Sequence, residues 1–251
     1  MSAALQDATV IRGGGPILDG VSVTCLPSHF TAFCGPNGAG KTTAFSLLTG
    51  ALRPDRGTSW FDGQEVRGIP VSALARRRAV VSQSSLLSFP FHVHEVVAMG
   101  RAPHEGRTTP QRDAMVVAEV MAAMDIMGFA DRNYLTLSGG ERQRVNIARA
   151  LAQVWEPVDD IGERWLFLDE PTSALDLKHQ ILLMRLLRRL ASDGWGILAV
   201  LHDLQLVQEH AQTVGLFKAG RLVACDATAE VLTPESVQST FGLDEPYAAL
   251  A

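Results

Sequence analysis

The sequence has few cysteines, no excess of positive charge and no long apolar run. Its three cysteines lack the paired spacing of zinc sites, so we expect buried, reduced thiols of the cytosolic kind at Cys25, Cys34 and Cys225. The net charge of −5 argues against a protein that holds nucleic acid by neutralising phosphates. No apolar run approaches about eighteen residues, and no charged N-terminal segment precedes an apolar core. We therefore expect neither a membrane span nor a signal peptide.

What is present fits one sizeable globular domain. The chain has 251 residues, of which 47% are hydrophobic and 20% charged, enough for one large domain or one domain with a lobe. Three of its histidines lie in one mostly apolar region, at His92, His94 and His104. No carboxylate or cysteine set completes a metal site around them. We therefore interpret them as packing or surface residues.

The clearest motif is a glycine-rich loop between an expected strand and an expected helix. An apolar run up to Phe33 predicts the strand, and the spacing of apolar residues from Ala44 to Leu48 predicts the helix. The loop and its first helical residues are Gly35, Pro36, Asn37, Gly38, Ala39, Gly40, Lys41, Thr42 and Thr43. Glycines allow a tight turn whose N–H groups cradle phosphates in front of a helix dipole. Such a phosphate loop would place Lys41 on the β- and γ-phosphates and Thr42 on Mg²⁺.

Two further strands are expected to end in side chains suited to nucleotide hydrolysis. Residues 165–168 are continuously apolar and lead to Asp169 and Glu170, and residues 197–201 lead to His202. Such runs are typical of strands buried on both faces, and open parallel sheets bind ligands at the carboxyl ends of their strands. We expect Asp169 to support Mg²⁺, Glu170 to orient or activate the attacking water, and His202 to contact the γ-phosphate.

Between these motifs the chain changes character. An apolar strand ends at Gln83, and the helical spacing and polar turns of residues 86–137 predict an all-helical lobe inserted into an α/β core. Directly after it, Ser138, Gly139 and Gly140 precede a helical pattern. A serine cap and two glycines at a helix N-terminus form a second anion cradle, although alone they would be an ordinary capping arrangement.

Together these motifs resemble the nucleotide-binding subunit of ABC transporters. The Walker A, Q-loop, signature, Walker B, D-loop and H-loop of that family match, in order, residues 35–42, Gln83, 137–143, 166–170, 173–176 and His202. The resemblance covers nearly the whole chain. It implies one nucleotide-binding domain over residues 1–251, with a P-loop NTPase core of mostly parallel sheet, an N-terminal antiparallel β subdomain and a helical subdomain at about 86–137. It further implies hydrolysis of ATP with Mg²⁺, which Gln83 would help to hold.

The same resemblance implies partners. In this family two copies meet head to tail, so Ser138, Gly139 and Gly140 would bind the γ-phosphate held by the other copy, and Asp176 would contact the opposite site. Intact motifs imply a homodimer with two equivalent sites. We expect it to be peripheral on the cytoplasmic face of the cell inner membrane, with Gln83 and the lobe passing motion to transmembrane permease subunits.

A finer resemblance concerns the cargo. Segments 87–91, 96–104, 148–155 and 169–180 look like those of importers for iron chelates and cobalamin. Haem is the expected cargo, delivered by a periplasmic haem-binding protein and passed through the permease. Ferric siderophore and cobalamin are the alternatives. A nucleic-acid partner is not expected.

The chain departs from the family pattern at the residue expected to contact adenine. Where related cassettes usually stack an aromatic side chain on adenine, this chain offers Ile11 or Arg12, and Arg12 could stack through its guanidinium plane.

Two other classes of protein fit the sequence less well. A soluble ABC ATPase acting on DNA or ribosomes would carry a long coiled coil or a second cassette, and neither pattern is present. A regulatory module without turnover would lack Glu170 or His202.

Overall fold

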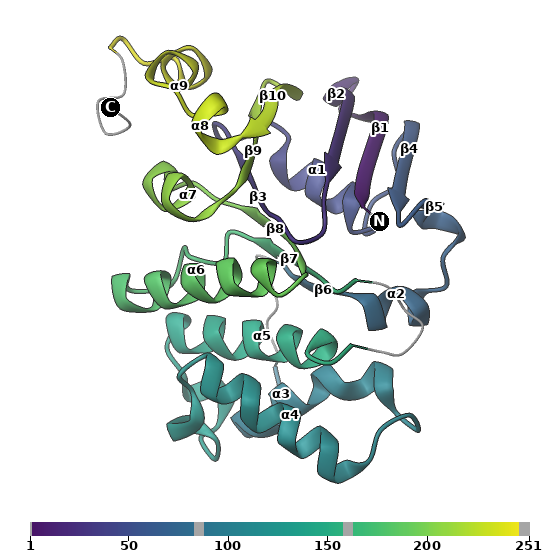
Figure 1. Ribbon diagram of the computed structural model, residues 1–251, viewed down its shortest axis with the longest axis vertical. Helices are drawn as coiled ribbons and strands as arrows, with labels where there is room; N and C mark the ends of the chain where they lie inside the picture. The colour runs from purple at the N-terminus through teal and green to yellow at the C-terminus, as the bar shows by residue number, and fades with distance from the viewer. Residues whose placement is uncertain (1, 83–87, 158–162, 246–251) are drawn as a thin grey trace.

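The computed structural model describes residues 2–82, 88–157 and 163–245, and Figure 1 shows their arrangement. The strands are β1 (Ala3–Arg12), β2 (Gly15–Cys25), β3 (Phe30–Cys34), β4 (Arg56–Phe61), β5 (Gln64–Glu65), β6 (Arg78–Val81), β7 (Trp165–Asp169), β8 (Gly196–Val200), β9 (Thr213–Lys218) and β10 (Arg221–Ala227). The α-helices are α1 (Lys41–Leu48), α2 (Val71–Arg77), α3 (Val93–Ala98), α4 (Pro110–Ala123), α5 (Gly139–Val154), α6 (Leu177–Ser192), α7 (Leu204–His210), α8 (Thr228–Val231) and α9 (Pro234–Phe241). Short 3-10 helices are η1 (Val66–Gly68), η2 (Met99–His104), η3 (Met127–Phe129) and η4 (Tyr134–Thr136).

The strands form two sheets. The larger has the order β10-β9-β3-β8-β7-β6, in which β6, β7, β8, β3 and β9 run parallel and β10 pairs antiparallel with β9. The smaller is antiparallel, with the order β2-β1-β4-β5. The expected α/β core of mostly parallel sheet with an N-terminal antiparallel subdomain is therefore confirmed.

Side chains of the central strands alternate between the two faces of the larger sheet, and each face packs against a different layer. In β7, Trp165 and Phe167 join the apolar cluster that contains α1 and the antiparallel sheet, whereas Leu166 and Leu168 join the cluster on the opposite face. Because successive side chains of a strand point to opposite faces, a fully apolar run is buried on both. The helix α1 is consequently enclosed between the two sheets, which fixes the loop that precedes it.

The helical lobe lies at the far end of the molecule from the antiparallel sheet, and Figure 1 shows α5 between α3 and α4 of the lobe and the central sheet. One apolar cluster runs without interruption from the lobe into the sheet. Gly100 allows a close approach, because a Cβ atom there would lie 2.1 Å from the carbonyl oxygen of Arg149 in α5. The expected helical lobe is thus present and packs directly on α5.

The first strand of the antiparallel sheet contains an irregular point. β1 begins at Ala3 and continues through a register shift near Asp7. Asp7 has a φ of 47°, which few residues other than glycine adopt. The helix α5 begins at Gly139, so the glycines of the second cradle form its first turn and do not precede it.

The cysteine side chains are shielded. Cys25 and Cys34 are buried and Cys225 is half-buried. Burial raises the pKa of the Cys34 thiol to about 12, against an opposing effect of nearby Lys41. Within the described residues, no helix is long and apolar enough to cross a lipid bilayer.

Candidate nucleotide-binding site

The phosphate loop connects β3 to α1, and two glycines determine its path. Gly35 has a φ of 141°, and a Cβ atom there would lie 2.2 Å from the carbonyl oxygen of Phe217 in β9. Gly40 has a φ of 98° and precedes α1 as its N-cap, with no side-chain hydrogen bond to the helix. Only glycine combines these conformations with such close packing. The first N–H groups of α1 therefore remain available to an anion.

Lys41 places a buried cation inside this loop. Its Nζ donates hydrogen bonds of 2.7 and 2.9 Å to the carbonyl oxygens of Gly35 and Pro36. Burial lowers the pKa of the ammonium group, while Cys34, Glu170 and Asp169 act in the opposite direction. The loop thus folds around its own lysine, whose charge is held where a phosphate chain would lie.

Thr42 and Asp169 bring the phosphate loop and β7 together. The Thr42 hydroxyl lies 3.4 Å from an Asp169 carboxylate oxygen, to which it donates a hydrogen bond. Asp169 is buried, and its pKa is raised by that burial and by neighbouring Glu170, although Thr42 and Lys41 oppose the rise. A buried carboxylate beside a hydroxyl is a donor set that suits a hard cation such as Mg²⁺.

Glu170 and His202 form a pair at the carboxyl ends of adjacent strands. Asp169 pairs with Val200 in the β7–β8 register, so the residues that follow emerge side by side. The Glu170 Oε1 and His202 Nε2 atoms are 2.7 Å apart. Glu170 also has a φ of 50°, a strained conformation for a residue with a Cβ atom. The fold therefore holds this carboxylate beside the histidine at a backbone cost.

One pocket of about 300 Å³ unites several predicted residues. Those that line it are Ile17, Asn37, Gly38, Ala39, Gly40, Lys41, Thr42, Thr43 and Glu170. Ile17 was not anticipated, because a single isoleucine in an N-terminal hairpin carries no signal of its own. Arg12 is not among the described residues that line this pocket, and its guanidinium instead lies 3.3 Å from the Asp55 carboxylate. The predicted site residue Gln83 lies outside the described residues.

The second cradle lies at the N-terminus of α5 and is built differently. Ser138 is the N-cap, and its hydroxyl accepts a hydrogen bond of 3.3 Å from the N–H of Glu141. The Glu141 carboxylate accepts in return from the N–H of Ser138 at 2.7 Å, which completes a capping box. The Ser138 N–H group is the largest cause of the lowered pKa of Glu141. Arg132 also pairs with this carboxylate, at 2.9 Å.

Asp176 lies with the second cradle rather than with the phosphate loop. It caps α6, and it lines an open hollow of about 520 Å³ together with residues of the second cradle. The members of this hollow are Ser138, Gly140, Glu141, Arg144, Ala174, Leu175, Asp176 and His179. Within one chain, the two groups of predicted phosphate contacts therefore line two separate cavities.

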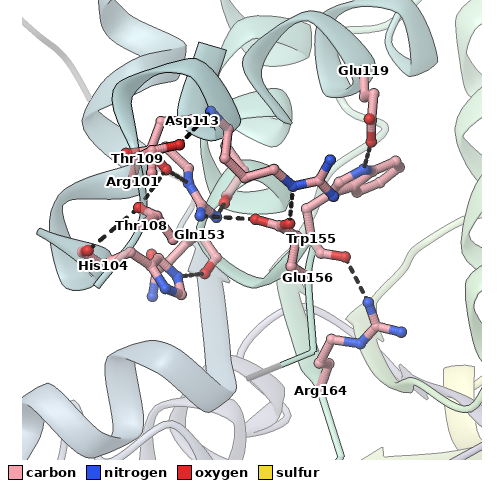
Figure 2. A network of polar contacts seen from close by, with 12 residues as sticks. Arg101, His104, Thr108, Thr109, Asp113, Glu119, Gln153, Trp155, Glu156 and Arg164 are labelled. Atoms are coloured by element: carbon pink, nitrogen blue, oxygen red, sulfur yellow. Dashed lines mark hydrogen bonds and ion pairs between the residues drawn. The ribbon is translucent and has the colours of Figure 1, made fainter. Parts of the chain in front are cut away.

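A polar network holds the opposite end of α5, as Figure 2 shows. Buried Arg101 donates to the carboxylates of Asp113 at 2.8 Å and Glu156 at 3.0 Å, and to the carbonyl oxygen of Ala152 at 2.7 Å. Gln153 donates to the carbonyl oxygens of Ala75 and Arg78, at 2.7 and 2.9 Å. The C-terminal end of α5 is thus tied both to the lobe and to the start of β6.

The three lobe histidines bond to backbone carbonyl groups. His92 contacts Asp131, His94 contacts Ala130 and His104 contacts Gln153, at 2.7, 2.9 and 2.8 Å. The imidazole of His104 has a lowered pKa, chiefly because of burial. Across the described residues, no three histidine, cysteine or acidic side chains are grouped so as to hold a metal ion.

The parallel sheet, the phosphate loop and the acidic residues at strand ends define a P-loop nucleotide-hydrolase cassette. A family model described as "ABC transporter" matches residues 18–173, so the chain belongs to the ABC transporter family. It is 40% identical to the hemin import ATP-binding protein HmuV of Rhizobium meliloti (strain 1021), over 94% of this chain and 90% of that protein. It is 43% identical to the protein of the same name from Escherichia coli O157:H7, over 92% of this chain and 88% of that protein.

A solved structure supports the fold. A dimeric ATP-binding cassette in a post-hydrolysis state, bound to ADP and Pi, matches with a TM-score of 0.78 over 90% of this chain and 98% of that chain. Its sequence identity is 24%, so the likeness concerns the fold alone.

Proposed function

We propose that this chain is the ATP-hydrolysing subunit of an ABC importer that energises haem uptake. The observation that carries the hydrolytic part is the 2.7 Å contact between Glu170 and His202 beside the phosphate loop. A carboxylate that accepts a proton from water needs a fixed position near the γ-phosphate. The neighbouring histidine would hold Glu170 there and contact the γ-phosphate.

The residues around this pair would bind and orient the nucleotide. Backbone N–H groups of residues 35–43 would cradle the phosphate chain, and Lys41 would exchange its carbonyl partners for the β- and γ-phosphates. The Thr42 hydroxyl and, through water, the Asp169 carboxylate fit Mg²⁺, with Gln83 as a further ligand. The raised pKa of buried Asp169 supports this assignment, since a bound cation would stabilise its charged form. When bound, Mg²⁺ would neutralise charge that develops on the β- and γ-oxygens.

A second copy would complete each site. Ser138 and Gly140 line a cavity apart from the phosphate loop, so a nucleotide bound to that loop would not reach them within one chain. A head-to-tail homodimer would bring this cradle and Asp176 to the γ-phosphate of the other copy. The dimeric state of the structural relative is consistent with that arrangement. ATP would then close the dimer, and hydrolysis would reopen it.

The cargo assignment rests on the relatives. Two proteins at 40% and 43% identity carry the name hemin import ATP-binding protein, and each aligns over more than nine-tenths of this chain. Haem would cross the cytoplasmic membrane through permease subunits, after delivery by a periplasmic haem-binding protein. This chain would sit on the cytoplasmic face as a peripheral subunit. Importers of ferric siderophores and cobalamin are the alternative for the cargo.

Uptake of labelled haem, ferric siderophore and cobalamin tests this proposal in cells that lack the gene. Complementation uses either the native chain or the Glu170→Gln variant, which should bind ATP yet hydrolyse it at least about 100-fold more slowly. We expect the native chain, and not the variant, to restore uptake of haem and of neither other cargo. If uptake of another cargo were restored, that compound would replace haem as the proposed cargo. If Glu170→Gln restored uptake, the proposed role of Glu170 would be contradicted.

A further inference from the structure

The first turn of α6 contains a histidine that contacts the candidate D-loop residue Asp176. The Asp176 Oδ1 atom accepts hydrogen bonds from the backbone N–H of His179 at 3.0 Å and from its ring Nδ1 at 2.7 Å. The imidazole side chain is only 14% exposed, whereas the Asp176 carboxylate is 67% exposed. A mostly buried ring therefore holds an exposed carboxylate in one orientation.

The other edge of this ring faces the helical lobe. His179 Nε2 lies 3.6 Å from the carboxylate of Asp125, which also accepts a hydrogen bond of 3.0 Å from Lys178. Asp125 follows α4, and its carbonyl oxygen accepts a hydrogen bond of 2.5 Å from Arg144 of α5. His179 thus stands between the segment that carries Asp176 and the turn of the lobe that is fixed to α5.

The neighbouring residues hold the same turn. The Gln180 amide donates to the carbonyl oxygens of Thr172 and Leu175, at 3.2 and 2.9 Å. Across the hollow, a Cβ atom at Gly140 would lie 2.7 Å from the carbonyl oxygen of Ala174. The turn before α6 and the second cradle are therefore packed against each other within one chain.

We propose that His179 is a positioning residue for ATP hydrolysis. It orients Asp176 toward the second copy and ties the turn of Asp176 to the lobe turn at Asp125, which is fixed to α5, the helix that begins at the second cradle. Both groups that one copy contributes to its partner's site would then move as one unit. This inference rests on the proposed function, because Asp176 acts only across a dimer. The lowered pKa of Asp176, caused first by the His179 N–H and then by the ring, is consistent with a carboxylate held in its charged form.

Steady-state ATP hydrolysis by three variants tests the inference. His179→Asn keeps an amide donor near the position of Nδ1, His179→Gln moves its donor outward to the position of Nε2, and His179→Ala has no donor. We expect Ala and Gln to lower kcat about 10-fold with KM for ATP within twofold, since the phosphate loop is unchanged. We expect Asn to stay within threefold of the native kcat. Native-like kcat for Ala or for Gln would overturn the inference.

A double-mutant cycle separates positioning from a loss of folding. If His179 acts through Asp176, His179→Ala should have no further effect on kcat in an Asp176→Ala chain. An equal tenfold loss in both backgrounds would contradict the inference. His29→Ala is the matched control, because this ring also bonds by Nδ1, to the Pro27 carbonyl oxygen, but lies before β3, away from the site.

The Glu170→Gln background distinguishes this inference from the proposed function. ATP-dependent dimers of Glu170→Gln are measured by size-exclusion chromatography, with and without His179→Ala. At saturating ATP, we expect His179→Ala to raise the protein concentration for half-maximal dimer about 10-fold. Equal midpoints with and without His179→Ala would contradict the role of His179 and leave the proposed function intact. Failure of Glu170→Gln to dimerise, together with inactive native protein, would reject the proposed function itself.

Discussion

The two anion cradles of this chain look alike in sequence but differ in what they already hold. The N-terminus of α1 has no side-chain cap and no acidic residue in its first turn, and Lys41 places a buried ammonium group within its loop. The N-terminus of α5 is closed by Ser138 and carries the Glu141 carboxylate. Negative charge in a first helical turn satisfies the N–H groups and the dipole that would otherwise attract an anion.

This difference implies an order of events. The first cradle supplies its own cation and is equipped to hold phosphate within a single chain. In the second cradle, the Glu141 carboxylate competes with phosphate for the helix N-terminus. This cradle would therefore bind a phosphate only when another copy presents a phosphate whose charge is already largely neutralised. We therefore expect ATP to bind before the dimer closes.

The largest effect should come from removing the cation of the first cradle. Lys41→Ala should weaken ATP binding by the single chain about 100-fold, because it deletes charge-assisted hydrogen bonds to phosphate. Gly139→Asp is the matched change in the second cradle, where a Cβ atom meets nothing within 4 Å. It should leave single-chain affinity within twofold and abolish ATP-dependent dimers. Calorimetric titration measures the ATP affinity of the single chain, and size-exclusion chromatography measures the dimers. Equal losses of ATP affinity in both variants would contradict the difference between the two cradles.

A smaller effect should follow from loosening the far end of α5. Arg101→Met keeps the aliphatic volume but removes the buried partner of Asp113 and Glu156 in Figure 2. We expect a loss of about 3 kcal/mol in the free energy of unfolding, measured in urea. Arg67→Met breaks an exposed pair with Glu65 and should cost no more than about 0.5 kcal/mol. Similar losses in both variants would show that the network does not support the helix.

The smallest effect concerns the capping box of the second cradle. Glu141→Ala should cost about 1 kcal/mol of unfolding free energy at neutral pH. Since the folded-state pKa of Glu141 is lowered, chiefly by the Ser138 N–H, this contribution is present above the unfolded pKa of about 4.3. It is lost as the pH falls through the folded value. Ser138→Ala removes the reciprocal bond but keeps the Glu141 carboxylate and the Ser138 N–H, the largest cause of its lowered pKa, so its cost should depend on pH less than that of Glu141→Ala between about 3 and 7.

Local patterns predicted the parts of the site that lie along single segments. The apolar runs before Gly35, Asp169 and His202 identified strands, and the register of β7 with β8 then accounts for the Glu170–His202 contact. A parallel sheet places successive strand ends at one edge, so spacing in the sequence was sufficient there.

Contacts between distant segments could not be predicted from the sequence. Arg12 was considered for adenine stacking, but its guanidinium lies beside Asp55, and nothing in the sequence links these two residues. Ile17 reaches the pocket only because a hairpin folds over it. The pairing of Arg101 with Glu156 joins residues 55 positions apart, as isolated charges without a repeat. Such contacts depend on tertiary packing, which composition and periodicity do not encode.

The shielding of Cys34 has a practical consequence for following closure of the dimer. Maleimides and methanethiosulfonates react with thiolates, and burial keeps the pKa of each of the three native thiols above its ordinary value. A cysteine introduced on an exposed surface would therefore take up a fluorophore or nitroxide faster than the native ones. Distances between two labelled copies could then be recorded without first deleting Cys34, the residue that leads directly into the phosphate loop.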